Sequence, residues 1–92
     1  MTIRHEPDAS RYVYLDEAGV EAGEVEYQRD GDTLRLLRAE VPMERRGEGL
    51  GLALVRETLE MIRDEHHGTI QPICPFIAKF MVKNPEFQAL RA

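Results

Sequence analysis

The chain has a single cysteine, Cys74, so an internal disulfide is excluded and a reducing compartment is favoured. It has no apolar run approaching the roughly 20 residues that a membrane-spanning helix needs. The first residues, Met1 to Pro7, are polar and lack the apolar segment of a signal peptide. From these absences we expect a cytoplasmic protein without a membrane partner.

Positive charge is scarce, since the 92 residues include 12 Lys and Arg against 17 Asp and Glu, a formal net charge of −5. This balance argues against a nucleic-acid partner, because a phosphate backbone requires a basic surface. Hydrophobic residues make up 42% of the chain and charged residues 32%, which is typical of globular proteins. The length predicts one domain over residues 1–92, at the small end of what holds a core unaided.

The first half of the sequence predicts antiparallel strands. The segment Arg11 to Leu15 is aromatic and β-branched, and Asp30-Gly31-Asp32 is typical of a hairpin turn. Gly23 is expected to mark a bend or bulge. The tyrosines are expected to pack in the core with a polar tip. We therefore expect strands over residues 2–5, 11–15, 20–29 and 33–41.

The last of these strands has an irregular pattern. Leu34 and Leu36 share one phase of the alternation, whereas Leu37 and Ala39 share the other. One interpretation is a central strand that is buried on both faces. The other is a β-bulge near Leu36 to Arg38 that changes the phase and re-aims the end of the strand. The two interpretations are compatible, and both stay open.

The second half changes to a helical period. Apolar residues from Gly49 to Glu65 recur at spacings of three and four, and Gly68 is placed to end this helix. A short strand over residues 69–74 follows, limited by prolines at 72 and 75, and then a helix over residues 75–83 and a turn over 86–90. We expect a mixed α+β fold in which antiparallel strands are followed by a helix, a strand and a helix.

Three glycines lie in the stretch Arg46 to Gly51, where the strand gives way to the helix. A helix start offers unpaired N–H groups and the positive end of the macrodipole, and glycine lets an anion approach the backbone. The Gly-x-Gly-x-Gly spacing is not that of a dinucleotide-binding loop, and the Gly-Lys-Ser or Gly-Lys-Thr of a P-loop is absent. We expect a phosphate-binding loop of another kind.

The pattern Arg-x-x-Gly-x-Gly, formed by Arg46, Gly49 and Gly51 after the strand end Val41-Pro42, resembles the pyrophosphate-binding segment of the GNAT superfamily of N-acetyltransferases. Two further motifs, Pro72-Ile73-Cys74-Pro75-Phe76 and Asn84-Pro85-Glu86-Phe87, resemble its small GNAT-like, or NATD-type, branch. The resemblance extends from Arg11 to Leu90. It implies a GNAT-like fold and transfer of an acetyl group from acetyl-CoA to an amine, either a small molecule or a protein lysine.

The resemblance also implies roles for particular residues. The loop would grip the CoA pyrophosphate, the strand end from Glu40 to Pro42 would lie along the pantetheine arm, and the adenine end would lie near Arg45. Cys74 would lie beside the thioester as a nucleophile or a neighbour of the acetyl group, and Glu40 is a candidate general base. A backbone N–H near Val41 would steady the oxyanion. The implied cofactor-binding residues are Val41, Pro42, Arg46, Gly47, Glu48, Gly49, Leu50, Gly51, Cys74 and Phe76.

Other interpretations stay open. Cys74 would serve equally well as a small buried hydrophobe, and the glycines as a closely packed turn. We expect no metal, because the side chains of the adjacent His66 and His67 diverge on a helix, and we expect them to complement the helix dipole instead. The chain departs from the family pattern at four places, which favours the alternative of a CoA-binding or protein-interaction module without turnover. These are Arg38-Ala39 in place of His-Thr, Asn84 and Phe87 in place of His and Tyr, and an acidic Glu48.

Overall fold

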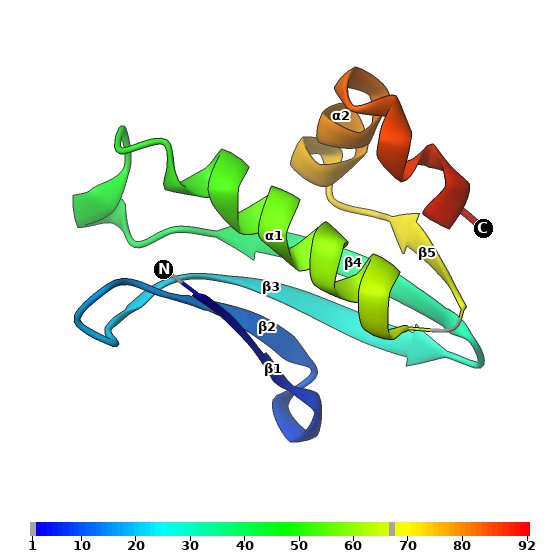
Figure 1. Ribbon diagram of the computed structural model, residues 1–92, viewed down its shortest axis with the longest axis horizontal. Coiled ribbons are helices and arrows are strands. Elements are labelled where there is room, and N and C mark those ends of the chain that lie inside the picture. Colours follow the sequence, from blue (N-terminus) through cyan, green and yellow to red (C-terminus); the bar gives the residue numbers. More distant parts are fainter. Residues whose placement is uncertain (1, 67) are drawn as a thin grey trace.

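The computed structural model of the protein describes residues 2–66 and 68–92 (Figure 1). The strands are β1 Thr2–Glu6, β2 Arg11–Leu15, β3 Glu21–Asp30, β4 Thr33–Glu40 and β5 Thr69–Pro72. The helices are α1 Leu50–Glu65 and α2 Pro75–Lys83, with short 3-10 turns at Pro7–Ala9, Met43–Arg45 and Pro85–Leu90. This order confirms the strands and helices expected from the sequence.

The strands form one sheet in the order β1-β2-β3-β4-β5. The first four strands are antiparallel to their neighbours, and β5 runs parallel to β4. Two neighbouring parallel strands must be joined by a crossover connection. The connection from β4 to β5 contains α1, which lies across one face of the sheet (Figure 1). The fold is therefore mixed α+β, as the sequence predicts.

One face of the sheet carries the hydrophobic core. The rings of Tyr12, Tyr14 and Tyr27 are buried there, as expected for packing residues. The apolar positions predicted for the two helices cover this face, since a helix buries one stripe of side chains. From α1 these are Leu50, Leu54, Val55, Leu59 and Ile62, and from α2 they are Ile77, Phe80 and Met81.

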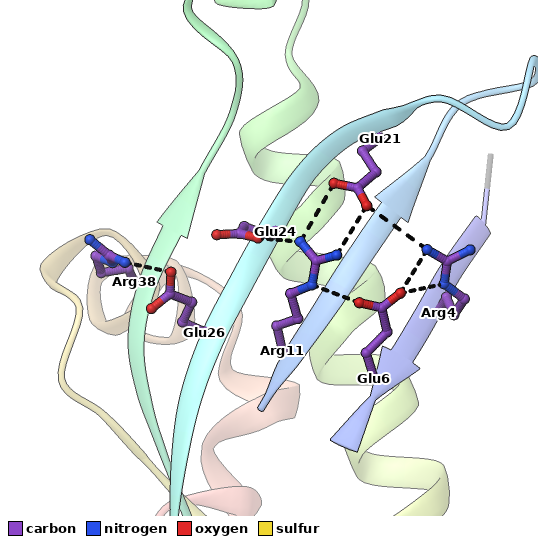
Figure 2. A network of polar contacts seen from close by, with 7 residues as sticks. All are labelled: Arg4, Glu6, Arg11, Glu21, Glu24, Glu26 and Arg38. Carbon is purple, nitrogen blue, oxygen red and sulfur yellow. Dashed lines mark hydrogen bonds and ion pairs between the residues drawn. The ribbon is translucent and has the colours of Figure 1, made fainter. Parts of the chain in front are cut away.

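The opposite face of the sheet is polar. Figure 2 shows Arg11 at its centre, where the guanidinium contacts Glu6 at 2.7 Å, Glu21 at 3.0 Å and Glu24 at 2.7 Å. Arg38 and Glu26 pair across β4 and β3 on the same face (Figure 2). These contacts join β1 to β3 through β2, so charge pairing occupies the side that the helices leave uncovered.

A β-bulge interrupts β4 at Leu37. Tyr27 pairs with Leu36 and Glu26 pairs with Arg38, so Leu37 is the extra residue. Because of this extra residue, Leu36 and Ala39 both pack toward the core. The bulge predicted near this position is confirmed. The expectation that β4 is buried on both faces is wrong, because Arg38 and Glu40 on the far side are exposed.

Two glycines lie where another segment of the backbone approaches them closely. A second register shift falls between Tyr14 and Leu15, opposite the part of β3 that contains Gly23, where a bend or bulge was expected. A Cβ atom on Gly23 would lie 3.1 Å from the carbonyl oxygen of Glu40, so the strands approach closely here. A Cβ atom on Gly68 would lie 1.9 Å from the carbonyl oxygen of Asp32, which no side chain tolerates.

The end of α1 differs from the expectation. The helix ends at Glu65 with His66 as its C-cap, so it stops before Gly68 is reached. The ring of His66 contacts the carbonyl oxygen of Asp32 at 3.0 Å rather than the end of its own helix. His67, the other half of the expected dipole pair, lies outside the described residues. The glycine is therefore needed for the approach of the β3–β4 hairpin.

β5 is shorter than predicted and ends at Pro72 rather than Cys74. Proline has no N–H to continue the ladder, which is the limit that the sequence indicated. The amides of Ile73 and Cys74 then both donate to the carbonyl oxygen of Leu36 at 3.0 Å. In the described ranges, 2–66 and 68–92, no helix combines the length and apolar composition needed to cross a membrane.

Candidate functional site

The segment between β4 and α1 forms an open glycine loop. Gly47 has a φ of 95° and Gly49 a φ of 78°, both in the left-handed region that favours glycine. Gly49 is the N-cap of α1 and supplies no side-chain hydrogen bond to the first turn. A Cβ atom added to either glycine meets nothing within 4 Å, so the loop borders open space. The loop therefore offers uncapped helix amides to a ligand.

An ion pair fixes this loop to the rest of the molecule. The Nη1 atom of Arg45 lies 2.7 Å from Oδ2 of Asp16, in the turn between β2 and β3. The backbone amides of Val20 and Ala18 both donate to Oδ1 of Asp16 at 2.9 Å. The bond from Val20, followed by that from Arg45, holds the pKa of Asp16 below its usual range. These bonds favour the ionised carboxylate of Asp16, which holds Arg45 in place.

Arg45 also offsets the charge of Glu48. The Nη2 atom of Arg45 lies 3.4 Å from a carboxylate oxygen of Glu48. The acidic residue that departs from the family pattern is thereby paired at the rim of the loop. No local pattern in the sequence indicates the ion pair between Arg45 and Asp16, because the two residues are 29 positions apart.

A cavity of about 450 Å³ lies against the glycine loop. Arg46 contributes an exposed cation to it and forms no ion pair with any described residue. The cavity therefore combines uncapped amides with an unneutralised positive charge. Seven of the predicted cofactor-binding residues line it together, namely Val41, Arg46, Gly47, Gly49, Leu50, Gly51 and Phe76.

A second cavity of about 460 Å³ continues from the first along β4. The ladder between β4 and β5 ends at the pair Leu36 and Pro72, next to the bulge. Beyond that pair, no described strand lies against the β5 side of β4. The two cavities share Val41, Arg46, Gly51 and Phe76, so the loop opens directly into this slot.

Gly51 has a structural role distinct from that of the other two glycines. It lies in the first turn of α1 and does not have a positive φ. A Cβ atom on Gly51 would lie 3.4 Å from Cζ of Phe76, the residue near the start of α2. The Phe76 ring therefore packs against the start of α1 and lines both cavities.

Glu40 lines the slot from the end of β4. Its side chain is 54% exposed, and Oε1 lies 3.4 Å from Nη1 of Arg38. Together with Val41 and Pro42, Glu40 also lines a smaller cavity of about 360 Å³ beside Glu21 and Glu24. The carboxylate is therefore accessible but already has a cationic neighbour.

Three predicted site residues do not line the loop cavity or the slot, and one of them, Pro42, lines the smaller cavity instead. Cys74 is half-buried, packs against the core, and is the N-cap of α2. Of the described residues that line the loop cavity or the slot, none is Cys74 or Glu48. Cys74 is tied to the end of the β4–β5 ladder by its amide rather than by its thiol.

Comparison with known proteins identifies the family. The family model described as GCN5-related N-acetyl-transferase matches residues 11–90. The chain belongs to the GCN5-related N-acetyltransferase family. This family consists of acyltransferases, so the chain is an acyltransferase of the N-acetyltransferase class, and the use of acetyl-CoA is implied by the family.

One of three similar solved structures has the same fold over nearly the whole chain. A GCN5-like putative N-acetyltransferase from Staphylococcus aureus is 20% identical, with a TM-score of 0.68, covering 98% of this chain and 86% of that one. A nourseothricin acetyltransferase is 32% identical, with a TM-score of 0.45, covering 59% of this chain and 33% of that one. A putative acetyl transferase from Pyrococcus furiosus is 24% identical, with a TM-score of 0.48 and coverages of 89% and 58%. No curated protein matches the chain by sequence.

Proposed function

We propose that this N-acetyltransferase binds acetyl-CoA in the glycine loop and the adjoining slot, and transfers the acetyl group to an amine. The observation that carries the proposal is the continuity of the two cavities through Val41, Arg46, Gly51 and Phe76. An extended molecule with an anionic segment fits such a path. The single domain and the cytoplasmic location expected from the sequence belong to the same proposal.

The anionic segment of acetyl-CoA is its pyrophosphate. Gly47 and Gly49 expose backbone amides at the start of α1, where the helix dipole favours negative charge. Arg46 adds a guanidinium that forms charge-assisted hydrogen bonds with phosphate oxygens. Leu50 and Gly51 lie in the first turn of α1, so their amides are available to the same anion as the amides of the loop. Glu48, paired with Arg45, lies at the rim.

The pantetheine arm then follows β4. Residues Glu40 to Pro42 lie at the end of this strand, where β5 no longer pairs with it, so the arm can bond to the backbone as an added strand would. A backbone N–H near Val41 is the proposed donor to the thioester oxygen as charge develops on it. Cys74 lies where the pairing of β4 with β5 ends, and we propose that it lies near the acetyl group.

Glu40 is the proposed general base. It takes a proton from the acceptor ammonium group, and the freed amine lone pair attacks the thioester carbonyl carbon. The tetrahedral intermediate expels the CoA thiolate, which takes up a proton, and the amide product keeps the acetyl group. The acceptor is a small amine or a protein lysine, bound on the side of β4 where Glu40 is exposed.

Titration calorimetry with acetyl-CoA tests the binding step. Gly49→Asp should abolish binding, because a carboxylate would stand against the pyrophosphate. Gly49→Asn is the matched control, since it has the same size without the charge and Asn tolerates a left-handed φ. Equal affinities for these two variants and the wild type would show that the pyrophosphate lies elsewhere.

An assay of CoA release with a panel of amines tests the chemical step. Release that depends on an amine supports the acetyltransferase. Acetyl-CoA binding without release for any amine would favour the alternative of a non-catalytic CoA-binding or interaction module, which the pairing of Glu40 with Arg38 and the missing histidine favour. If the protein does not bind acetyl-CoA at millimolar concentration, the three glycines serve only to form a closely packed turn.

A further inference from the structure

The two edges of the sheet differ. At the β5 edge, Arg91 bridges to Ile70, and the amide of Ala92 donates to the carbonyl oxygen of Ile70 at 2.8 Å. At the opposite edge, β1 pairs only with β2, and no described strand lies on its outer side (Figure 1). In an antiparallel pair, every second residue directs its N–H and C=O groups away from the partner strand. β1 is therefore an open edge that a further strand can extend.

A hollow of about 380 Å³ lies between this open edge and α1. Thr2 and Ile3 line it from β1, and Ile3 packs against the core, so the hollow is on the face of the sheet that α1 covers. The residues that line it from α1 are mostly acids, and no described cation lines it. They are Glu57, Glu60, Met61, Asp64 and Glu65. Negative charge therefore flanks the open edge on its helix side.

These carboxylates are less neutralised than those on the uncovered face of the sheet. On that face, Arg11 alone contacts three carboxylates. In the hollow, Asp64 contacts only its chain neighbour Arg63, at 3.2 Å. The three glutamates of the hollow form no ion pair with any described residue. The hollow therefore offers its charge to a partner.

The same acids weaken the helix that carries them. Glu60 and Asp64 are four residues apart on α1, a spacing at which like charges repel each other. Asp64 and Glu65 lie in the last turn, where the helix dipole favours cations. None of them belongs to the buried stripe of α1, so core packing does not account for their presence. A cationic partner would relieve both unfavourable effects.

We propose that β1 and this hollow together bind an extended basic segment of a partner protein, which adds to the sheet as a strand beside β1. Main-chain hydrogen bonds supply affinity in such an arrangement, and alternate side chains of the added strand point to the same face. Arginine or lysine at every second position would therefore face the carboxylates of α1. A second copy of this chain would bring its own acids to the same edge, so charge complementarity favours a basic partner.

The test uses a peptide of alternating arginine and valine with blocked ends. Arginine is chosen because its guanidinium stays charged and cannot act as the acceptor amine of an acetyltransferase. In an NMR titration, the peptide should shift the amide resonances of residues 2–6 and of Glu57, Glu60 and Asp64. A peptide with glutamate in place of arginine should bind at least about ten-fold more weakly, because several charge pairs are lost. Shifts confined to other elements, or equal affinities for the two peptides, would overturn the inference.

A variant of the hollow tests the acids themselves. Glu57→Gln/Glu60→Gln/Asp64→Asn keeps the size of the three side chains and removes their charge. It should bind the arginine peptide at least about ten-fold more weakly than the wild type does. Its thermal stability should be no lower than that of the wild type, because like charges on α1 no longer repel each other. The comparison of the two peptides needs only the wild type, so it decides the matter even if this variant fails to fold.

The matched control is Glu17→Gln/Asp30→Asn/Glu86→Gln, which removes three exposed acids elsewhere and should bind the peptide as the wild type does. Equal affinities for the hollow variant and the wild type would overturn the inference. A wild-type dimer in analytical ultracentrifugation that also protects the β1 amides from hydrogen exchange would overturn it too, because a second copy would then occupy the edge. These measurements need no acetyl-CoA, so their failure leaves the proposed function intact.

Discussion

The amide nitrogen of Cys74 donates to the carbonyl oxygen of Leu36 over 3.0 Å, and this bond lies where β4 and β5 separate. The amide of Ile73 shares the same oxygen. Pro72, just before, cannot donate to the ladder, and Leu37, just after Leu36, is the bulge. One irregularity in each strand therefore opens the slot that we assign to the pantetheine arm.

Deleting Leu37 should close the slot. Without the extra residue, β4 would keep the same side chains toward the core but could continue alongside β5, because the register shift disappears. We expect a folded protein whose affinity for acetyl-CoA is at least about ten-fold lower, measured by calorimetry with circular dichroism as the check on folding. Leu37→Ala is the control, since it keeps the number of residues and should bind normally. Normal binding by the deletion variant would contradict our assignment of the arm.

Replacing Cys74 tests its role directly. If the thiol takes part in acetyl transfer, Cys74→Ala should lower the rate of CoA release by about ten-fold or more while leaving acetyl-CoA affinity unchanged. The amide bond to Leu36 is a main-chain contact and should survive the substitution. An unaltered rate would reduce Cys74 to a packing residue. Mass spectrometry of the acetyl-CoA-treated protein would separate a nucleophile, which carries the acetyl group, from a neighbour, which does not.

Gly68→Ala should destabilise the protein. The added Cβ atom would lie 1.9 Å from the carbonyl oxygen of Asp32, so the β3–β4 hairpin and the end of α1 must move apart. Overpacking of this kind costs about 1–3 kcal/mol, measured as the free energy of unfolding in urea. The control is Gly51→Ala, whose Cβ would meet the Phe76 ring at 3.4 Å, an ordinary contact. Equal stability for Gly68→Ala and the wild type would mean that this approach is looser than described.

Thr58→Val should stabilise the protein. Thr58 is 1% exposed on the buried side of α1, and its Oγ1 atom has no hydrogen-bond partner among the residues that the structure describes. Valine has the same branched shape without the hydroxyl, and removing an unsatisfied buried hydroxyl gains about 1 kcal/mol. Thr58→Ser is the control, because it keeps the hydroxyl and loses the methyl group, and it should be less stable than the wild type. Thermal unfolding of the two variants would decide the matter.

His5 should make stability depend on pH. Its ring stacks on Tyr12 at a centroid distance of 4.3 Å and contacts the Tyr27 hydroxyl at 2.6 Å. Burial, partly offset by Glu65, lowers the pKa of His5 below its ordinary value of 6.5. In the unfolded chain the ring takes up a proton near pH 6.5, so below this pH the unfolded state binds more protons and stability falls.

His5→Phe keeps a ring on Tyr12 but cannot titrate. The loss of stability as the pH falls below about 6.5 should therefore be smaller in His5→Phe than in the wild type. Tyr27→Phe is the control, because it removes the hydroxyl contact and leaves the titrating group. The His5 ring resonance, followed by NMR, should titrate below its ordinary range, and a value at or above that range would contradict the prediction.

The sequence predicted the elements well because their patterns are local. The apolar spacing of Leu54, Leu59 and Ile62 shows which side of α1 is buried, and the phase change at Leu37 indicates the bulge. The glycine loop and its position at the start of α1 were also visible, since glycine spacing is itself the pattern. These features need no knowledge of distant residues.

Other features depend on residues that meet only after folding. Gly68 was interpreted as a helix stop. The structure shows instead that the carbonyl oxygen of Asp32, on the β3–β4 hairpin, leaves no room for a side chain at this position. A cavity between α1 and α2 is lined by Arg56, Lys79 and Lys83, and no spacing in the sequence predicts that these residues line one cavity. The ion pair between Asp16 and Arg45, which supports the glycine loop, also joins residues that are far apart in the sequence and could not be predicted.

The guanidinium of Arg11 has a consequence for the acceptor. Figure 2 shows two of the carboxylates that it contacts, Glu21 and Glu24, on the uncovered face of the sheet. Both also line the cavity of about 360 Å³ beside Glu40. An incoming ammonium ion thus meets acids that already have a resident cation. Glu40 likewise has Arg38 at 3.4 Å, so each of the three carboxylates is paired with an arginine and offers an acceptor little attraction by charge alone.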